Sequence, residues 1–291
     1  MRKWWIGVLT LFLLGVQEKN LPTRLKMTTG IGDIFYTSEE AKQMAQYVSL
    51  VMNQLLWYWM WEGKVPKDME ELCQSPYFPI RCSDFRSIYT GKPVGEWKKE
   101  EPGTFWFEPE EPGQRLKVHF TLIVDGEPKT VSQTWFPYPN VELCWDLVKG
   151  WTREDIASAT VAKTVSSFAN FPSHFGLSGD KPRTFEELVG KVPLLKYLRN
   201  EFTGGYATAS KVPSEGNFSY EYRPIPKRNP AGIHGANPNG YKFHQEAVKV
   251  KAWGTQKKVL YYDTTSRIDF PGYGSYQDPC DTPEILENLP W

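Results

Sequence analysis

The sequence predicts an α+β fold made of two similar modules in tandem, each a helix packed on a small antiparallel β-sheet. Two observations carry this prediction. Short motifs recur at a nearly constant spacing along the 291 residues. In each half, a segment with the apolar spacing of a helix precedes segments with the alternation of β-strands.

The clearest repeated motif is a proline followed by a short segment with two adjacent glutamates. Residues 66–72 read Pro-Lys-Asp-Met-Glu-Glu-Leu, and residues 182–188 read Pro-Arg-Thr-Phe-Glu-Glu-Leu, 116 positions later. Further matches, 113 positions apart, pair residues 89–91 with 202–204 and residues 103–108 with 216–221. The difference in spacing falls in the loop between Cys73 and Cys82, where a duplicated fold tolerates a change of length. Because the glutamate pairs occupy equivalent positions, a structural role is favoured over acid/base catalysis.

Each half begins with a helix that a capping box introduces. Thr37 and Glu40 form one such box, and Thr152 and Asp155 form the other. The apolar residues that follow recur at the i, i+3, i+4, i+7 spacing of one helix face. In the first helix they are Ala41, Met44, Ala45, Val48, Val51, Met52, Leu55 and Trp59, and in the second they are Ile156, Ala159, Val161, Val165 and Phe168.

An antiparallel hairpin is predicted downstream of each helix, because alternating segments flank a short turn. The two predicted hairpins cover residues 116–136, around the turn Asp125-Gly126, and residues 243–263, around the turn Gly254-Thr255. Each module therefore has about three antiparallel strands after its helix.

The domain boundary is placed near Gly150. Residues 1–20 are expected to form a signal or N-terminal apolar segment, residues 21–150 the first module, and residues 151–291 the second module with a C-terminal arm. An insertion rich in Pro, Asn and Gly at residues 226–240 predicts a surface loop in the second module. The arm at residues 271–291 has little periodicity and is expected to pack as an irregular strap.

The repeated segments resemble the globular head of type IV pilins and type II secretion pseudopilins. The closest match combines Tyr-Thr-Gly-Lys-Pro-Val at residues 89–94 with Glu-Pro-Gly-Thr-Phe-Trp-Phe at residues 101–107, and the second half holds a degenerate version. The resemblance spans roughly residues 37–136 and 152–263. It implies two pilin-like modules in tandem, without the family's cleavage motif and its long N-terminal hydrophobic helix.

The N-terminal residues have the pattern of an export signal. Arg2 and Lys3 precede an uncharged run of 13 residues, 4–16, which is too short to span a bilayer of about 30 Å as a helix. An uncleaved anchor and a helix or strand of the folded protein are the alternatives. Export would place the protein outside the cell or at the cell surface.

The four cysteines form an even set, which fits disulfides in an exported protein and allows three pairings. Cys73 and Cys82 bracket a short loop, so we expect them to pair and to close a loop at the surface. Cys144 and Cys280 would then join the middle of the chain to its C-terminal part. Buried free thiols are the alternative, and a zinc site is disfavoured because the chain has no Cys-x-x-Cys.

Features typical of enzymes and of nucleic-acid-binding proteins are scarce. The 34 basic and 34 acidic residues cancel, which removes the basic field expected of a protein with a nucleic-acid partner. Neither a phosphate-binding glycine loop nor a Gly-x-Ser-x-Gly elbow occurs. His119 lies in a predicted strand as a solvated or hydrogen-bonded histidine, and His234 and His244 with Glu246 set no metal geometry. We therefore expect no catalytic residue, no cofactor and no metal.

The most unusual segment is the aromatic run at residues 55–61. Trp57, Tyr58 and Trp61 are interpreted as a subunit contact, together with Trp291. A helix end buried between the two repeats and a sugar-stacking platform are the alternatives.

These features together predict a non-enzymatic exported structural protein. It would assemble with copies of itself into an extracellular filament or surface layer, in contact with the cell envelope or with polysaccharide. A secreted carbohydrate-binding or hydrolase accessory protein is the alternative.

Overall fold

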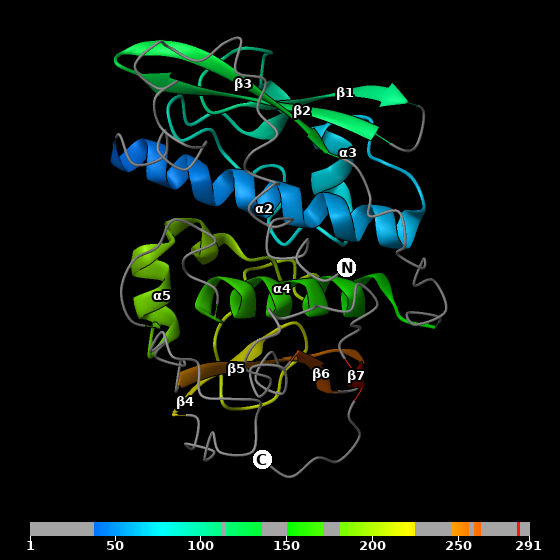
Figure 1. The fold of residues 1–291 in the computed structure, drawn as a ribbon. Coiled ribbons are helices and arrows are strands. Elements are labelled where there is room, and N and C mark those ends of the chain that lie inside the picture. The colour runs from blue at the N-terminus through cyan, green and yellow to red at the C-terminus, as the bar shows by residue number, and fades with distance from the viewer. Residues whose placement is uncertain are drawn as a thin grey trace, which may run out of the picture.

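Two long helices, one from each half of the chain, lie side by side at the centre of the molecule (Figure 1). Helix α2 (Glu39–Glu62) carries a three-stranded sheet on its outer side, and helix α4 (Arg153–Asn170) carries a four-stranded sheet. The layers therefore run sheet, helix, helix, sheet, and the predicted α+β class is confirmed. The computed structural model describes residues 38–111, 115–135, 150–170, 181–224, 246–255, 259–262 and 284–285.

Helix α2 begins one residue later than the sequence predicts. The hydroxyl of Ser38 accepts a hydrogen bond from the backbone N–H of Ala41 at 3.0 Å, so Ser38 is the N-cap. The predicted cap, Thr37, lies outside the described residues. The helix ends at Gly63, whose positive φ of 66° directs its N–H to the carbonyl of Trp59. The sequence offers two adjacent capping residues, and the better one, serine, is used.

The first half continues with α3 (Met69–Gln74), the 3₁₀ helix η3 (Val94–Glu96) and the strands β1 (Phe105–Glu111), β2 (Arg115–Val124) and β3 (Glu127–Trp135). The strands pair antiparallel in the order β1-β2-β3. Asp125 and Gly126 have positive φ values of 54° and 85°, as a two-residue hairpin turn requires, and the predicted hairpin is confirmed. Alternate residues of β2, among them Leu116, Val118 and Phe120, are buried on the face toward α2.

The second half holds α5 (Phe185–Lys191), the 3₁₀ helix η6 (Pro193–Tyr197) and the strands β4 (Phe218–Pro224), β5 (Glu246–Trp253), β6 (Val259–Tyr262) and β7 (Glu284–Ile285). Thr152 and Asp155 form the predicted capping box of α4, because the side chain of each accepts a hydrogen bond from the backbone N–H of the other. Strands β5 and β6 pair antiparallel where the second hairpin is predicted, but Trp253 lies opposite Val259, so the connection is longer than the predicted turn Gly254-Thr255. Strand β7 belongs to the segment expected to be an irregular strap, and it adds a fourth strand beside β6.

A turn with the same hydrogen bonds occurs in both halves, 113 positions apart. In the first half, the hydroxyl of Ser87 donates to the carbonyl of Pro102 at 2.7 Å. In the second half, the side-chain amide of Asn200 donates to the carbonyl of Glu215 at 3.0 Å. Each side chain also accepts hydrogen bonds from the backbone N–H groups two and three residues further along. We call this arrangement, residues 87–103 and 200–216, the shared turn.

Glycines at matching positions complete the shared turn. Gly91 and Gly204 both have a φ of 70°, and Gly103 and Gly216 both have a φ of 77°. A Cβ atom added at position 103 would lie 2.4 Å from Oγ of Ser87, and one added at position 216 would lie 2.0 Å from Oδ1 of Asn200. Positions 103 and 216 therefore require glycine twice over, for the positive φ and for the close approach of a side chain.

Candidate functional site

The aromatic run of α2 is buried inside the chain. Trp57 and Tyr58 are each 3% exposed, and Trp61 is 7% exposed. The ammonium of Lys163, on α4, lies 3.3 Å from the centre of the Trp57 ring. The end of α2 is thus packed between the two halves, and the expectation that these three residues form a subunit contact is corrected, because their own chain covers them. Trp291 lies outside the described residues.

Helix α4 is rich in small buried residues and packs mainly on strands β5 and β6 of its own half. Its residues that are at most 2% exposed include Ala157, Ser158, Ala159, Thr160, Ala162, Thr164, Ser166 and Ala169. Two buried amides also bridge the halves: Gln54 donates to the hydroxyl of Thr164 at 3.3 Å, and Gln46 donates to the carbonyl of Lys191 at 3.0 Å. The first bond joins α2 to α4, and the second joins α2 to the end of α5, so both orient the two halves relative to each other.

Cys73 and Cys82 form the predicted disulfide, with their Cα atoms 5.4 Å apart. The loop that it closes, residues 74–81, is not the surface loop that the sequence suggests. Phe78 is fully buried and Ile80 is 1% exposed. The loop lies against the second half of the chain, and we call it the junction loop. Cys144 and Cys280 lie outside the described residues.

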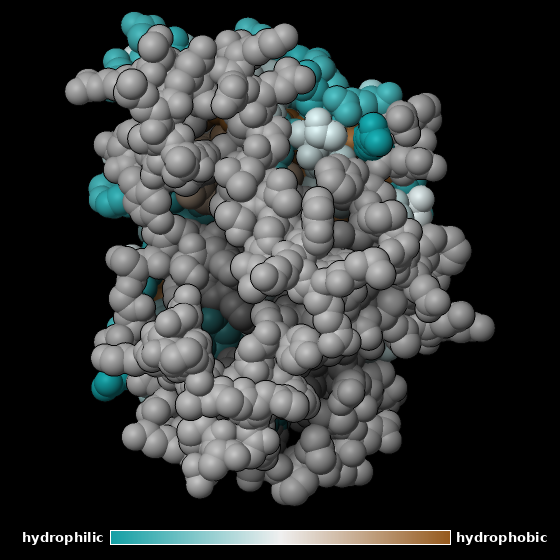
Figure 2. All heavy atoms as spheres, viewed as in Figure 1, coloured by the Kyte–Doolittle hydropathy of each residue, from teal (hydrophilic) through white to brown (hydrophobic). Residues whose placement is uncertain are grey.

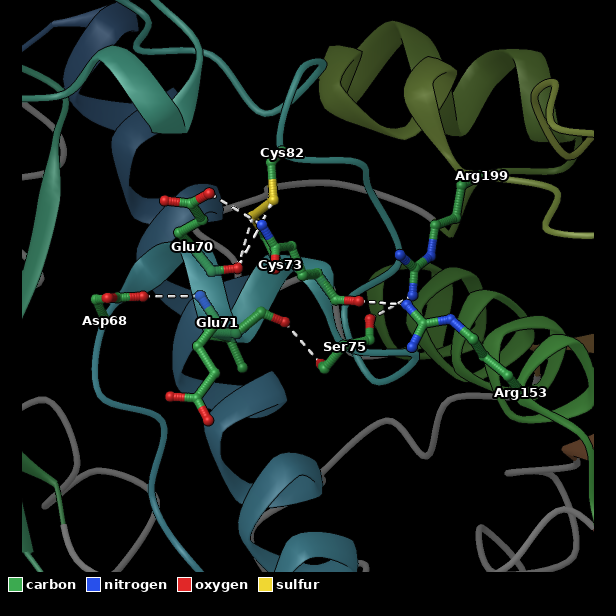
Figure 3. Close-up of a disulfide and its surroundings, with 10 residues drawn as sticks. Asp68, Glu70, Glu71, Cys73, Ser75, Cys82, Arg153 and Arg199 are labelled. Atoms are coloured by element: carbon green, nitrogen blue, oxygen red, sulfur yellow. Dashed lines mark hydrogen bonds between the residues drawn. A yellow bond between two sulfur atoms is a disulfide. The ribbon is translucent and has the colours of Figure 1, made fainter.

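Two arginines of the second half bind carbonyl groups at the start of the junction loop (Figure 3). Arg199 donates to the carbonyl of Ser75, and Arg153 donates to the carbonyl of Gln74. The backbone N–H of Arg199 also donates to the carbonyl of Pro79 at 2.9 Å. One residue of the second half therefore bonds both ends of the loop.

The last residues of the junction loop bind the second half as well. Ile80 and Leu198 form an antiparallel bridge. The guanidinium of Arg81 donates to the carbonyls of Asn200 and Gly205, at 3.3 and 2.8 Å. Because Asn200 belongs to the shared turn of the second half, the junction joins the loop of one half to the turn of the other.

Arg199 is a buried charge at this junction. It is 3% exposed, and its Nε lies 3.1 Å from a carboxylate oxygen of Glu201. Burial lowers the pKa of the guanidinium to about 10, the charge of Glu201 opposes this, and Arg153 and Arg81 add to the lowering. Arg199 therefore stays charged at neutral pH, and its buried N–H groups need the carbonyl and carboxylate acceptors that surround it.

Glu71 and Glu187 bind the backbone at the starts of α3 and α5, one residue before the N-caps Asp68 and Thr184. The carboxylate of Glu71 accepts from the backbone N–H of Lys67 at 2.8 Å, and that of Glu187 accepts from the N–H of Arg183 at 2.7 Å. The second glutamate of each pair thus has the same structural role in both halves, as the equivalence of their positions indicates.

An open hollow of about 350 Å³ beside α3 is lined by Lys67, Asp68, Glu70, Glu71 and Gln74. Burial acts to raise the pKa of Glu71, but hydrogen bonds from the Lys67 N–H, Lys64 and Tyr58 lower that pKa to about 2. The carboxylate is therefore ionised at neutral pH and engaged by donors of the protein itself. It does not have the raised pKa of a general acid.

A line of polar side chains crosses the face of the first sheet opposite α2. Nδ1 of His119 lies 2.8 Å from Oγ of Ser132, and Nε2 lies 3.1 Å from a carboxylate oxygen of Glu108. The imidazole stacks on the ring of Trp106 with 4.9 Å between centres. Burial lowers the pKa of His119, and the charge of Glu108 opposes this. The expectation of a hydrogen-bonded histidine agrees with this environment.

The order acid, imidazole, hydroxyl is that of a hydrolase triad, and sequence reasoning missed it because only the register of β1, β2 and β3 brings the three groups together. We interpret Glu108, His119 and Ser132 as a cross-strand network, because the three side chains come from β1, β2 and β3 and contact one another in sequence.

His174, His234 and His244 lie outside the described residues. Within the part of the chain that the structure describes, no three His, Cys, Asp or Glu side chains gather as a metal site requires, and no helix has the length and apolar character needed to cross a membrane. Comparisons of the chain with protein-family models, curated proteins and solved structures find no match. Function is therefore argued from the geometry of the chain itself.

Proposed function

We propose that the protein is a non-enzymatic exported structural protein, built from two tandem pilin-like modules, that serves as a self-assembling subunit of an extracellular filament or surface layer. The shared turn is the observation that carries this proposal. The pilin-like segments at residues 89–94 and 101–107 are the ones that build it, together with Ser87. The same hydrogen bonds around Asn200 support a second copy of the module.

The use of the polar side chains supports a structural role. Glu71 and Glu187 cap helices, and Arg153 and Arg199 bind the junction loop. In the described residues, the buried charges and amides discussed above are engaged in holding the chain together. The Cys73–Cys82 disulfide fits a protein that works in an oxidising compartment, and this supports export.

Assembly has to use surfaces other than the aromatic run of α2. On the face drawn in Figure 2, the described residues that reach the surface are mostly hydrophilic. Among the described residues, the large exposed apolar side chains are Tyr206 and Val212, 46% and 72% exposed. Strands β1 and β3 form the two edges of the first sheet as described. Edge strands offer backbone N–H and C=O groups to a neighbouring chain, and we propose these edges as the contacts.

Electron microscopy of the purified full chain in negative stain, with N-terminal sequencing of the protein from its host, tests the proposal. Filaments or ordered arrays, and a mature N-terminus beyond residue 16, are the expected results. A chain that stays monodisperse at high concentration would contradict self-assembly. If that monomer also binds a soluble polysaccharide, the carbohydrate-binding alternative takes its place.

A further inference from the structure

We propose that the Cys73–Cys82 disulfide is a thiol-sensitive latch on the junction between the two halves. While the disulfide is closed, it holds the junction loop in the shape that Arg153 and Arg199 bind. When a dithiol reduces it, this side of the junction loosens while α2 and α4 stay packed together. The inference rests on the proposed function in one respect, namely that the two halves of the chain are separate modules.

The latch is argued first from where the contacts lie along the loop. The acceptors for Arg153 and Arg199 are the carbonyls of Gln74 and Ser75, directly after Cys73. The contacts of Pro79, Ile80 and Arg81 lie directly before Cys82. The two sets of contacts therefore flank the two cysteines. The disulfide, with its Cα atoms 5.4 Å apart, fixes the spacing between them.

The equivalent connection of the second half shows that the module itself does not need a disulfide. The chain there passes from α5 through η6 to Leu198 without a cysteine. Backbone hydrogen bonds within the same half hold it, from Val192 to Leu188, from Leu195 to Val192 and from Leu198 to Leu195. The disulfide is thus an addition found in the half whose connection is bound by arginine side chains of the other half.

The two cysteines differ in exposure, and this sets the order of the reaction. Cys73 is fully buried, whereas Cys82 is partly exposed. A thiolate of the dithiol attacks Sγ of Cys82, and Cys73 leaves as a thiolate that takes up a proton. The second thiol of the reagent then displaces Cys82, which is also protonated. The protein gains two electrons and two protons, and the dithiol becomes a cyclic disulfide.

Once the bond is open, the ends of the junction loop are held only by non-covalent contacts. Closing a loop of this size by a disulfide removes conformational freedom from its ends, and reduction restores that freedom. Arg199 then loses the fixed pair of carbonyls at Ser75 and Pro79 that covers it. The amide of Gln54 and the ring of Trp57 lie on α2, outside the loop, and keep their contacts with α4.

Hydrogen exchange of the full chain tests the latch at single amides. The reporter is the N–H of Arg199, which bonds the carbonyl of Pro79 across the junction. The control is the N–H of Val248, which bonds Asn170 within the second half. In the double variant Cys73→Ser with Cys82→Ser, exchange at Arg199 is expected to rise at least about tenfold while Val248 is unchanged. Cys144 and Cys280 stay intact in this variant.

A second measurement keeps the inference falsifiable if the variant folds poorly. Native protein is titrated with dithiothreitol, and tryptic cleavage after Arg199 is followed together with the free thiols of Cys73 and Cys82. Cleavage that appears in step with these two thiols supports the latch. Unchanged protection of Arg199 from trypsin overturns the latch. Hydrogen exchange that rises at the Val248 N–H to the same extent as at the Arg199 N–H also overturns it. Neither readout depends on assembly, so failure of the latch and failure of the filament proposal are distinguishable.

Discussion

The two halves of the chain agree in one region and differ in the next. The shared turn is built by Ser87 in one half and Asn200 in the other, with glycines of equal φ at matching positions. The connection that precedes it is a disulfide-closed loop in the first half and a 3₁₀ helix in the second. The shared turn needs glycines with positive φ at the same positions in both halves. The two connections also differ in their contacts across the junction. Arginine side chains bind that of the first half, whereas Gln46 and Ile80 contact that of the second.

The central helices of the two halves also differ, in the size of the side chains that they bury. Helix α2 buries bulky side chains such as Leu55, Trp57 and Met60, whereas α4 buries mainly alanine, serine and threonine. Helix α4 lies between α2 and the second sheet and is covered on both sides (Figure 1). The contacts between the two helices include the hydrogen bond from Gln54 to Thr164 and the ammonium of Lys163 over the ring of Trp57. The two central helices therefore bury side chains of different size, although each half places its helix before its sheet.

The largest effect is expected from adding a methyl group inside the shared turn. Gly216→Ala should lower the free energy of unfolding by about 3 kcal/mol, because the new Cβ meets the Asn200 side chain at a positive φ. Gly204→Ala has open space at its Cβ and should cost about 1 kcal/mol, from φ alone. Urea unfolding measures the free energy of unfolding of both variants. In the first half, Gly103→Ala should likewise cost more than Gly91→Ala. Equal losses of stability at positions 204 and 216 would contradict the close approach of Asn200 to position 216 in the shared turn.

The next effect separates two arginines at equivalent positions. Arg199→Met should cost about 2–3 kcal/mol, because the carbonyl of Ser75 and the carboxylate of Glu201 lose a buried partner. Arg86→Met, 113 positions earlier and exposed, should cost less than about 0.5 kcal/mol, because its bond to the carbonyl of Gly91 is open to water. Thermal unfolding at neutral pH compares the two. An equal loss of stability in the two variants would contradict a stabilising role of the buried Arg199 contacts at the junction.

The smallest effect concerns acid stability. The folded-state pKa of Glu71 is lowered to about 2, below its unfolded value, so its contribution is complete above about pH 4.5 and is lost as the pH falls toward 2. Glu71→Gln should therefore cost about 1–2 kcal/mol at neutral pH and flatten the stability profile below pH 4.5. Glu70→Gln is the matched control, since the exposed carboxylate of Glu70 accepts a hydrogen bond from the Gln74 side chain, whereas that of Glu71 accepts one from the backbone at the start of the helix. If the two variants have the same acid profile, the capping role of Glu71 is wrong.

Local patterns predicted local structure. The capping box at Thr152, the hairpin at Asp125-Gly126 and the pairing of Cys73 with Cys82 follow from short-range chemistry, and all three are present. The first helix cap was misplaced by one residue because two adjacent residues could both cap. The sequence did not predict that the junction loop would be buried, because burial of a loop depends on the partner that covers it.

The interpretation of the aromatic run as a subunit contact was wrong for the same reason, and its burial agrees with the alternative of a buried helix end. Its residues Trp57, Tyr58 and Trp61 lie partly outside the main apolar stripe of their helix, which shows that a second surface must cover them and does not show which one. The structure covers them with their own chain. The network of Glu108, His119 and Ser132 was missed because cross-strand neighbours depend on strand register.

The central claim is that the two halves of one chain pack on each other through the junction. It is tested most directly by cross-linking Asp84→Cys to Tyr206→Cys, since the Tyr206 hydroxyl donates to the Asp84 carboxylate at 3.2 Å across the junction and Tyr206 is exposed. A short bismaleimide applied to dilute protein should join the two cysteines within one chain, as peptide mass spectrometry shows, and either single variant should give no such product. A cross-link formed only between chains, or none at all, would contradict the account.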